Sequence, residues 1–354
     1  MRKSFWFFLV EFLGWFAIAQ SLDDEKYILL LGGFKGEDDP QKKVLIYNKE
    51  DGRTLNCLNY ANDHIVEGSL GAILMGLDDE ERILVTCGGK GPDNAGKCFQ
   101  LNGDKWERSS SMFRQYEKGG ASIQLSDSKF LITGGFHIYH SKDTPDADSE
   151  VFNGKQWGSG PNLPYGIAHH CALNINSNTT MIIGGEIQNQ ISPRTFIYDW
   201  KFETWRSGPE LNIGRKFHSC GLHLGKVIIT GGENEEGKAL NVTEIFDPVL
   251  NKIFFGPRLN HSITKAAMVS LNSNELYLIG GHLTQAVDII VPQKHIIQYK
   301  DSGKWIKVGE LSVPMYLHTA HGVPESFWYN CQSSASIIIA LNSFYLICMV
   351  NAFL

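Results

Sequence analysis

The sequence predicts an all-β protein that folds as a six-bladed β-propeller with four antiparallel strands in each blade. An apolar run that ends in a double glycine recurs about every fifty residues, which is typical of repeated supersecondary units that are stable only beside their neighbours. Short strand-like runs, turns rich in Gly, Asn and Asp, and the lack of helical periodicity favour a propeller. The six pairs are Gly32-Gly33, Gly88-Gly89, Gly134-Gly135, Gly184-Gly185, Gly231-Gly232 and Gly280-Gly281.

The same order of runs follows in every unit. A buried run reaches the glycine pair, a polar loop leads to a run with Tyr, Phe or Leu, and a turn leads to a last run. The first unit uses 27–33, 42–47 and 55–58. The later units use 83–89, 97–101 and Trp106; 130–135, 150–152 and Trp157; 181–185, 195–198 and Trp205; 227–232, 243–246 and Phe254; and 275–281, 296–299 and Trp305.

A further half-apolar run precedes the glycine strand in every unit but the first. These runs are 68–75, 119–125, 169–175, 218–224 and 265–271. The first unit lacks this strand, and a matching run, 317–323, stands at the far end of the repeats. We therefore expect the C-terminal strand to close the ring by pairing with 27–31 in the first blade.

The two ends of the sequence differ from the repeats. Arg2 and Lys3 precede an apolar run, and Ala17-Ile18-Ala19 supplies a small-residue cleavage site, so residues 1–19 are interpreted as a signal peptide. An uncleaved membrane anchor is the alternative, although Glu11 interrupts the run. The propeller is expected over 20–331, with an apolar tail over 332–354.

The tail allows several interpretations. Residues 326–354 carry no charge, and residues 337–354 are strongly apolar. A lipid-anchor signal, a short membrane span, an added strand and a reading-frame error in the gene all remain open. We expect a secreted protein, or a cell-surface protein if the tail anchors it in the membrane.

Composition excludes some classes of function. The 354 residues are 43% hydrophobic and 20% charged, which is typical of a globular chain. The net charge of −6 argues against a nucleic-acid partner, because such proteins are usually basic on at least one face.

The cysteines and glycosylation acceptors agree with export of the protein through an oxidising compartment. Cys87 and Cys98 fall on adjacent antiparallel strands, which predicts a disulfide, and Cys57 and Cys331 are expected to staple the ring closure. Cys171 and Cys220 take matching positions in consecutive units, and buried free thiols are the simpler expectation for them. The acceptor asparagines are Asn178, Asn241 and Asn260.

The glycine pair, the later Tyr or Phe and the final Trp resemble the kelch repeats of galactose oxidase-type propellers. The resemblance covers residues 27 to about 324. Kelch repeats often place an Arg three residues before a His; Arg215 and His218 keep both, Arg114 keeps the Arg, and His169 and His318 keep the His. The resemblance implies that Trp106, Trp157, Trp205 and Trp305 pack between blades.

The family includes enzymes as well as binding proteins. Copper oxidases, sialic acid mutarotases and iron-dependent specifier proteins use kelch-type propellers, whereas intracellular members serve as ubiquitin-ligase adaptors or actin binders. Candidates for a channel site are Arg114, Arg215, His169 and His218, with hydrogen bonding between blades as the alternative role. We expect no enzyme activity and no cofactor; a carbohydrate-binding or sugar-modifying protein that uses the channel is the rival hypothesis.

Strand order predicts the binding face. In a four-stranded antiparallel blade, the loop between the second and third strands and the connection between blades emerge together, and long loops on a rigid scaffold usually carry function. We expect a protein partner here, basic because the loops are acidic, with a glycan as another ligand. The candidate residues are His137, Tyr139, His140, Asp143, Asp146, Asp148, Arg194, Glu233, Glu235 and Glu236. The histidines and aspartates of 136–149 are expected to be solvated, without a metal.

Overall fold

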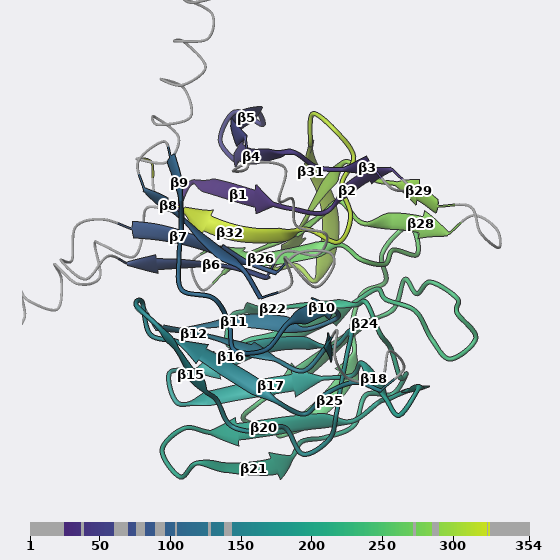
Figure 1. The fold of residues 1–354 in the computed structure, drawn as a ribbon. Helices are drawn as coiled ribbons and strands as arrows, with labels where there is room; N and C mark the ends of the chain where they lie inside the picture. Colours follow the sequence, from purple (N-terminus) through teal and green to yellow (C-terminus); the bar gives the residue numbers. More distant parts are fainter. Residues whose placement is uncertain are drawn as a thin grey trace, which may run out of the picture.

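The computed structural model describes residues 25–36, 39–59, 70–75, 82–88, 96–102, 105–126, 129–137, 144–271, 274–284, 290–323 and 325. Over these residues the chain forms six four-stranded antiparallel sheets, the blades of a propeller (Figure 1). The predicted fold class is confirmed. No helix in the described part of the chain is long and apolar enough to cross a membrane. The predicted signal peptide and the tail over 332–354 lie outside the described residues.

Each blade runs from an innermost strand at the channel to an outermost strand at the rim. From the channel outward, blade I contains β32 (Thr319–Val323), β1 (Tyr27–Leu31), β4 (Lys43–Asn48) and β5 (Thr54–Asn59), and blade II contains β6 (Leu70–Met75), β7 (Arg82–Cys87), β8 (Cys98–Asn102) and β9 (Lys105–Arg108). Blade III contains β11 (Ala121–Ser126), β12 (Lys129–Thr133), β14 (Ser149–Phe152) and β15 (Trp157–Ser159), and blade IV contains β16 (Cys171–Asn176), β17 (Thr179–Ile183), β20 (Thr195–Asp199) and β21 (Thr204–Ser207). Blade V contains β22 (Ser219–His223), β23 (Lys226–Thr230), β24 (Thr243–Asp247) and β25 (Lys252–Phe255), and blade VI contains β26 (Ala267–Leu271), β27 (Glu275–Ile279), β30 (His295–Lys300) and β31 (Lys304–Glu310).

The second strand of each blade is apolar because it is covered on both faces by the neighbouring blades. All five residues of β1 are buried, and β12, β17 and β23 are buried after their first residue. The outermost strands β21 and β25 are largely exposed. A continuous apolar run therefore marks the second strand, as expected for a strand buried on both sides.

The ring is closed by the C-terminal strand, as the sequence predicts. β32 pairs antiparallel with β1, with Tyr27 opposite Val323 and Leu31 opposite Thr319. The innermost strand of blade I thus comes from the end of the repeats, while the other three come from their beginning.

The double glycine is required by close contact with the next connection between blades. Gly184 and Gly185 have φ angles of 57° and 93°. A Cβ atom on Gly184 would lie 2.7 Å from the Arg215 carbonyl oxygen and 2.8 Å from Cε1 of His218. Neither the positive φ nor the space allows a side chain here.

The repeat tryptophans lie at junctions between blades. The Trp157 indole N–H donates to the Ser110 carbonyl at 3.0 Å, and the Trp305 indole N–H donates to the Thr243 hydroxyl at 3.1 Å. The rings of Tyr198 and Trp205 lie 4.9 Å apart. The tryptophans therefore fasten the outermost strands of blades III, IV and VI to their surroundings.

Candidate functional site

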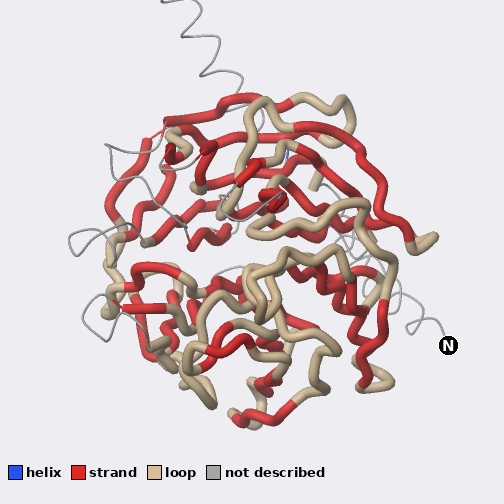
Figure 2. The backbone as a smooth tube through the Cα atoms, turned by 90° about the vertical axis from the view of Figure 1, so that its right-hand side faces the viewer, coloured by secondary structure: helices blue, strands red, loops and turns tan. Residues whose placement is uncertain are grey.

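The loops between the second and third strands, here called the 2–3 loops, gather on one side of the ring with the connections between blades. They carry small hairpins that the sequence does not predict: β2 (Phe34–Gly36) with β3 (Asp39–Pro40), β18 (Glu186–Ile187) with β19 (Gln190–Ile191), and β28 (His282–Thr284) with β29 (Ile290–Pro292). They lie together at the right of Figure 1, and Figure 2 views the molecule from that side. We call this side the loop face.

Among the described residues, backbone pairing holds the 2–3 loops of blades I, III, IV, V and VI to the connection that enters each blade. In blade III, β13 (Phe136–His137) of the 2–3 loop pairs with β10 (Tyr116–Lys118) of the connection. Isolated bridges do the same between Ala168 and Glu186, Lys216 and Glu233, Thr264 and His282, and Phe34 and Tyr316. The loop face is therefore a hydrogen-bonded surface, which suits a preformed binding site.

Five residues with a left-handed backbone conformation lie around the channel on this face. Gly119, His169, Phe217, Lys265 and Leu317 hold equivalent places and have φ angles of 76°, 55°, 55°, 57° and 54°. From His169 onward, each backbone N–H donates to the carbonyl of the previous member, at 2.7 to 3.0 Å. This chain of bonds crosses from blade to blade and fixes the channel mouth.

Three of these residues, His169, Phe217 and Lys265, lie beside the side chains of Phe136, Lys118 and Lys216. We call these six residues the mouth cluster. The His169 ring lies 4.0 Å from the Phe217 ring and 5.6 Å from the Phe136 ring. The ammonium groups of Lys265 and Lys216 lie 4.7 and 5.6 Å from the Phe217 ring centre, and that of Lys118 lies 5.4 Å from the Phe136 ring centre. The cluster combines cations and aromatic faces, which attract each other.

Carboxylates balance two of these lysines. Lys216 contacts Glu186 at 2.7 Å and Lys265 contacts Glu233 at 3.7 Å, all four side chains being half-buried. Burial, together with the nearby charges of Lys216 and Lys118, lowers the pKa of His169 to about 3. His169 is therefore neutral at physiological pH and contributes an aromatic ring to the cluster.

The sequence interpretation placed the repeat histidine one residue too early in blade IV. His170, His218 and His318 hold equivalent buried places, where Cε1 of each packs against the first glycine of the preceding blade's pair. His169 instead takes the left-handed place at the mouth. Two adjacent histidines cannot be told apart by spacing.

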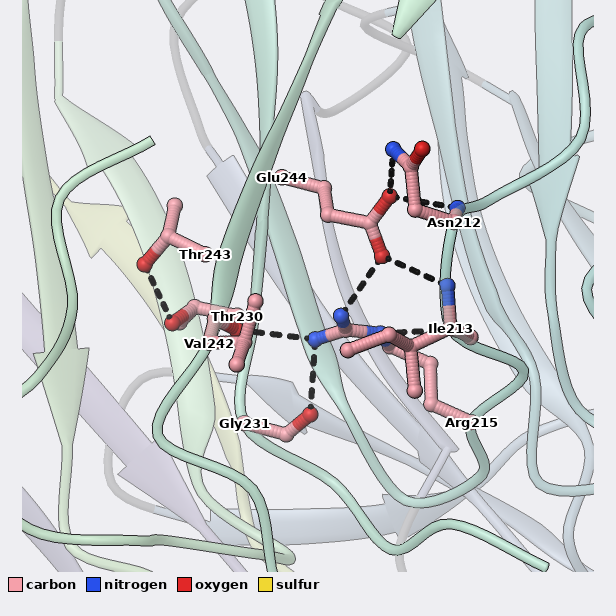
Figure 3. Close-up of polar contacts among 8 residues, drawn as sticks. All are labelled: Asn212, Ile213, Arg215, Thr230, Gly231, Val242, Thr243 and Glu244. Atoms are coloured by element: carbon pink, nitrogen blue, oxygen red, sulfur yellow. Dashed lines mark hydrogen bonds and ion pairs between the residues drawn. The ribbon is translucent and has the colours of Figure 1, made fainter. Parts of the chain in front are cut away.

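Arg215 does not lie at the mouth, contrary to the channel-site prediction. Its side chain is fully buried, and the guanidinium donates to Glu244 at 2.7 Å and to the carbonyls of Gly231 and Val242 (Figure 3). Glu244 also accepts the backbone N–H groups of Asn212 and Ile213. His218 is buried as well and packs between Gly184 of blade IV and Gly232 of blade V. Within the described residues, the Arg215 side chain bonds only to blade V and to the connection that enters it.

Glu150 holds the place of Glu244 in blade III but lacks the buried arginine. It accepts the backbone N–H groups of Phe113 and Arg114, while the Arg114 guanidinium contacts Asp148 at 2.6 Å. Burial raises the Glu150 pKa to about 7. Arg114 thus lies at the edge of the blade III loop, where it contacts Asp148.

No family model matches the chain. Kelch repeat protein M-T8 of Myxoma virus (strain Lausanne) is 28% identical over 137 residues, which cover 39% of this chain and 26% of that protein. Kelch-like protein 41b of Danio rerio is 32% identical over 128 residues, which cover 36% and 20%. A solved structure, described as the structure of YjhT, has a TM-score of 0.61 at 14% identity and covers 78% of this chain and 96% of its own.

The chain is a kelch-repeat β-propeller. The six repeats, the closed ring of blades and the two kelch relatives agree on this. The matched segments span between a fifth and about a quarter of these relatives' lengths. The structural likeness shows the fold alone.

Most acidic residues predicted for the loop face of this kelch propeller have partners. Glu233 contacts Lys265, Glu236 contacts Lys238 at 2.7 Å, and the Glu235 carboxylate accepts the Ile191 backbone N–H at 3.0 Å. The Arg194 guanidinium lies 5.3 Å from the centre of the Tyr165 ring. The centre of the described face carries lysines and aromatic rings, whereas the sequence interpretation expected acidic groups.

The blade III loop brings three predicted residues together. Nδ1 of buried His137 lies 3.0 Å from the Asp146 carboxylate, and one ligand atom from each of His137, Asp146 and Asp148 falls within 4.8 Å of the others. Asp146 also accepts the Asp148 backbone N–H, and Asp148 contacts Arg114. These bonds give the cluster a structural role. Tyr139, His140 and Asp143 lie outside the described residues.

Two disulfides join described cysteines of the kelch propeller. Cys87 and Cys98 are bonded across the hairpin, as predicted. Cys171 and Cys220 are also bonded, with Cα atoms 6.0 Å apart, so the expectation of free thiols is wrong. Innermost strands converge at the channel, which brings matching positions of adjacent blades close enough to bridge. Cys57 is disulfide-bonded, but Cys331 lies outside the described residues and their pairing stays a prediction.

The three glycosylation candidates differ in accessibility. Asn178 and Asn260 are exposed. The Asn241 amide donates to the Leu259 carbonyl at 3.3 Å and accepts from Arg258 at 3.0 Å. Asn178 and Asn260 are therefore the better acceptors.

The channel holds a cavity of about 320 Å³ between the innermost strands. Its polar lining includes Ser122, Asn174, Ser270 and His321, with Glu25 at one end. Burial lowers the His321 pKa to about 4. No arginine lines this cavity among the described residues.

Proposed function

We propose that this kelch propeller is a protein-recognition scaffold whose partner binds the loop face over the mouth cluster. The observation that carries the proposal is the set of three lysines held around the Phe136, His169 and Phe217 rings. Aromatic residues and rigid cations at the centre of a preformed surface are the features that anchor protein partners. The predicted preference for a basic partner is replaced by one for a surface that offers carboxylates or aromatic rings to the mouth.

Charge reversal at Lys118 tests the proposal without disturbing an ion pair, because its side chain is exposed and lies only over the Phe136 ring. Linear peptides selected from a random phage-displayed library on the wild-type protein serve as the probe. We expect Lys118→Glu to weaken the selected peptides about tenfold, or about 1.4 kcal/mol, because the repulsion at an exposed position is screened by water. Lys129→Glu is the matched control, as Lys129 opens β12 at the opposite face. Selected peptides that bind both variants as tightly as the wild type would disprove the assignment of the face.

We also propose that the protein is secreted and N-glycosylated. The predicted signal peptide over 1–19 and the two disulfides support this, because structural disulfides persist in oxidising compartments. Expression of the full chain in animal cells should give protein in the medium whose gel mobility increases after glycosidase treatment. Asn178→Gln with Asn260→Gln should remove that shift. Retention of the full chain inside the cell would contradict secretion.

A second candidate function uses the channel cavity to bind a small hydroxylated molecule such as a monosaccharide. Its hydroxyl and amide lining is the observation that favours it. A concentration-dependent rise in melting temperature with one sugar of a panel, lost in Asn174→Leu, would support this function.

A further inference from the structure

A second pocket opens on the loop face, where the connection from blade V to blade VI packs against blade VI. It is formed by the connection over 259–263, by Leu283 and Gln293 of the blade VI loop, and by Ile297 and Trp305 of the blade. Its volume of about 140 Å³ is close to that of a cavity that holds one benzene ring, roughly 150 Å³. The pocket is therefore the size of a single large apolar side chain.

The pocket has a cationic edge. Lys307, His261 and His295 line it, and Lys294 stands beside His295 in sequence. Glu310 contacts Lys294 at 2.6 Å, contacts Lys307, and lies 3.7 Å from His295. Two lysines thus share one carboxylate, which leaves a net positive charge beside an apolar hole.

An apolar hole beside unbalanced positive charge fits a ligand with the opposite arrangement. We propose that this pocket is an anchor site for a partner peptide, taking one leucine- or phenylalanine-sized side chain while Lys307 binds a carboxylate on the adjacent residue. The inference rests on the proposed function, since it supposes a protein partner on the loop face. Buried apolar anchors in pockets usually supply most of the binding energy of such interfaces.

The carboxylate should act mainly on specificity. Lys307 is half-exposed, so its contact with an added charge is screened by water and contributes modestly. The apolar side chain, in contrast, is removed from water in a pocket that contains the Trp305 ring. Loss of the ring or the aliphatic chain should therefore weaken binding more than loss of the charge.

Short capped peptides can test both parts. The probes are acetyl-Gly-Phe-Glu-Gly-amide, its Phe-Gln analogue and its Ala-Glu analogue, and the readout is the methyl NMR signals of Ile263 and Ile297, which both line the pocket. We expect the Phe-Glu peptide to shift both signals, the Phe-Gln peptide to bind about threefold more weakly, and the Ala-Glu peptide to cause no saturable shift. Leu283→Trp should fill the pocket and abolish binding.

Charge variants complete the design. Lys307→Gln should remove the preference for Glu over Gln, whereas Lys304→Gln, on the same strand outside the pocket lining, should keep it. Lys118→Glu should bind the probes normally, so failure of this pocket and failure of the mouth site are distinguishable. The proposal is overturned if no peptide shifts the methyl signals, if Phe-Gln binds as well as Phe-Glu, or if a glycan on Asn260 occupies the pocket and excludes the probes.

Discussion

At the scale of single residues, one junction between blades carries an ion pair where its neighbours carry apolar contacts. The carbonyls of Ile167, Arg215, Ile263 and Met315 each accept the second glycine N–H of the preceding blade, so the four residues are equivalent. Phe196 follows Thr195 as Glu244 follows Thr243, and both threonine carbonyls accept from a glycine. The Arg215–Glu244 ion pair thus takes the place that the apolar pair Ile167 and Phe196 takes at the preceding junction.

We expect Arg215→Ile alone to cost about 3–5 kcal/mol of unfolding free energy, because it leaves the Glu244 carboxylate buried without its cation. Arg215→Ile with Glu244→Phe should recover more than half of that loss, since apolar pairs can replace buried ion pairs. Urea denaturation of the single and double variants measures both. Arg114→Ala, which breaks an exposed contact, should cost about 1 kcal/mol or less. A double variant as unstable as Arg215→Ile would contradict the equivalence.

Spacing could predict the glycine pairs and the buried second strands, but not which histidine faces the mouth. His169 and His170 differ in the sign of φ, which depends on the hydrogen bond from the His169 backbone N–H to Gly119. That bond links two blades. A single sequence contains no local signal for it.

At the scale of elements, the two disulfides act differently. Cys87–Cys98 closes a hairpin of sequence separation 11, whereas Cys171–Cys220 spans 49 residues and joins the innermost strands of blades IV and V. The hairpin bond was predictable because adjacent antiparallel strands are local. The bond between blades depends on how strands converge around the axis, which the repeat period does not reveal.

Removing the longer bond should cost more stability. In the loop-entropy account, Cys171→Ser with Cys220→Ser loses about 4 kcal/mol, and Cys87→Ser with Cys98→Ser loses about 3 kcal/mol. Guanidinium unfolding of the two double variants compares them, and peptide mapping of the unreduced protein checks the pairing. Alkylation of Cys171 as a free thiol in the unreduced wild type would remove the basis of the comparison.

A different limit explains the small hairpins of the loop face. Each hairpin pairs within its own loop, and its strands are only two or three residues long. Strand propensity identified the blade strands because burial makes them apolar. It could not identify strands that are too short to show an apolar pattern.

At the scale of the whole molecule, ring closure makes stability depend on the last strand. A chain that ends at Gly309 lacks β32, so β1 loses its innermost partner and the face of Tyr27–Leu31 is opened. We expect this truncation to abolish a single sharp thermal transition, whereas a chain that ends at Gln332 should keep it. Differential scanning calorimetry provides the measurement. An equally sharp transition at an unchanged temperature in the shorter chain would show that closure is dispensable.

The pairing of β1 with β32 also sets how the molecule answers mechanical load. Tyr27 and Val323, the residues at which the chain enters β1 and leaves β32, lie opposite each other at one end of the ladder. Tension applied between the ends would therefore unzip the hydrogen bonds one after another, and blade I would yield first. In the other blades the two innermost strands follow each other directly along the chain. Tension between the chain ends therefore does not act on their pairing before blade I opens. The predicted Cys57–Cys331 bond would pass the tension to β5 instead, and reduction of that bond would then turn a load-bearing ring into one that opens under small forces.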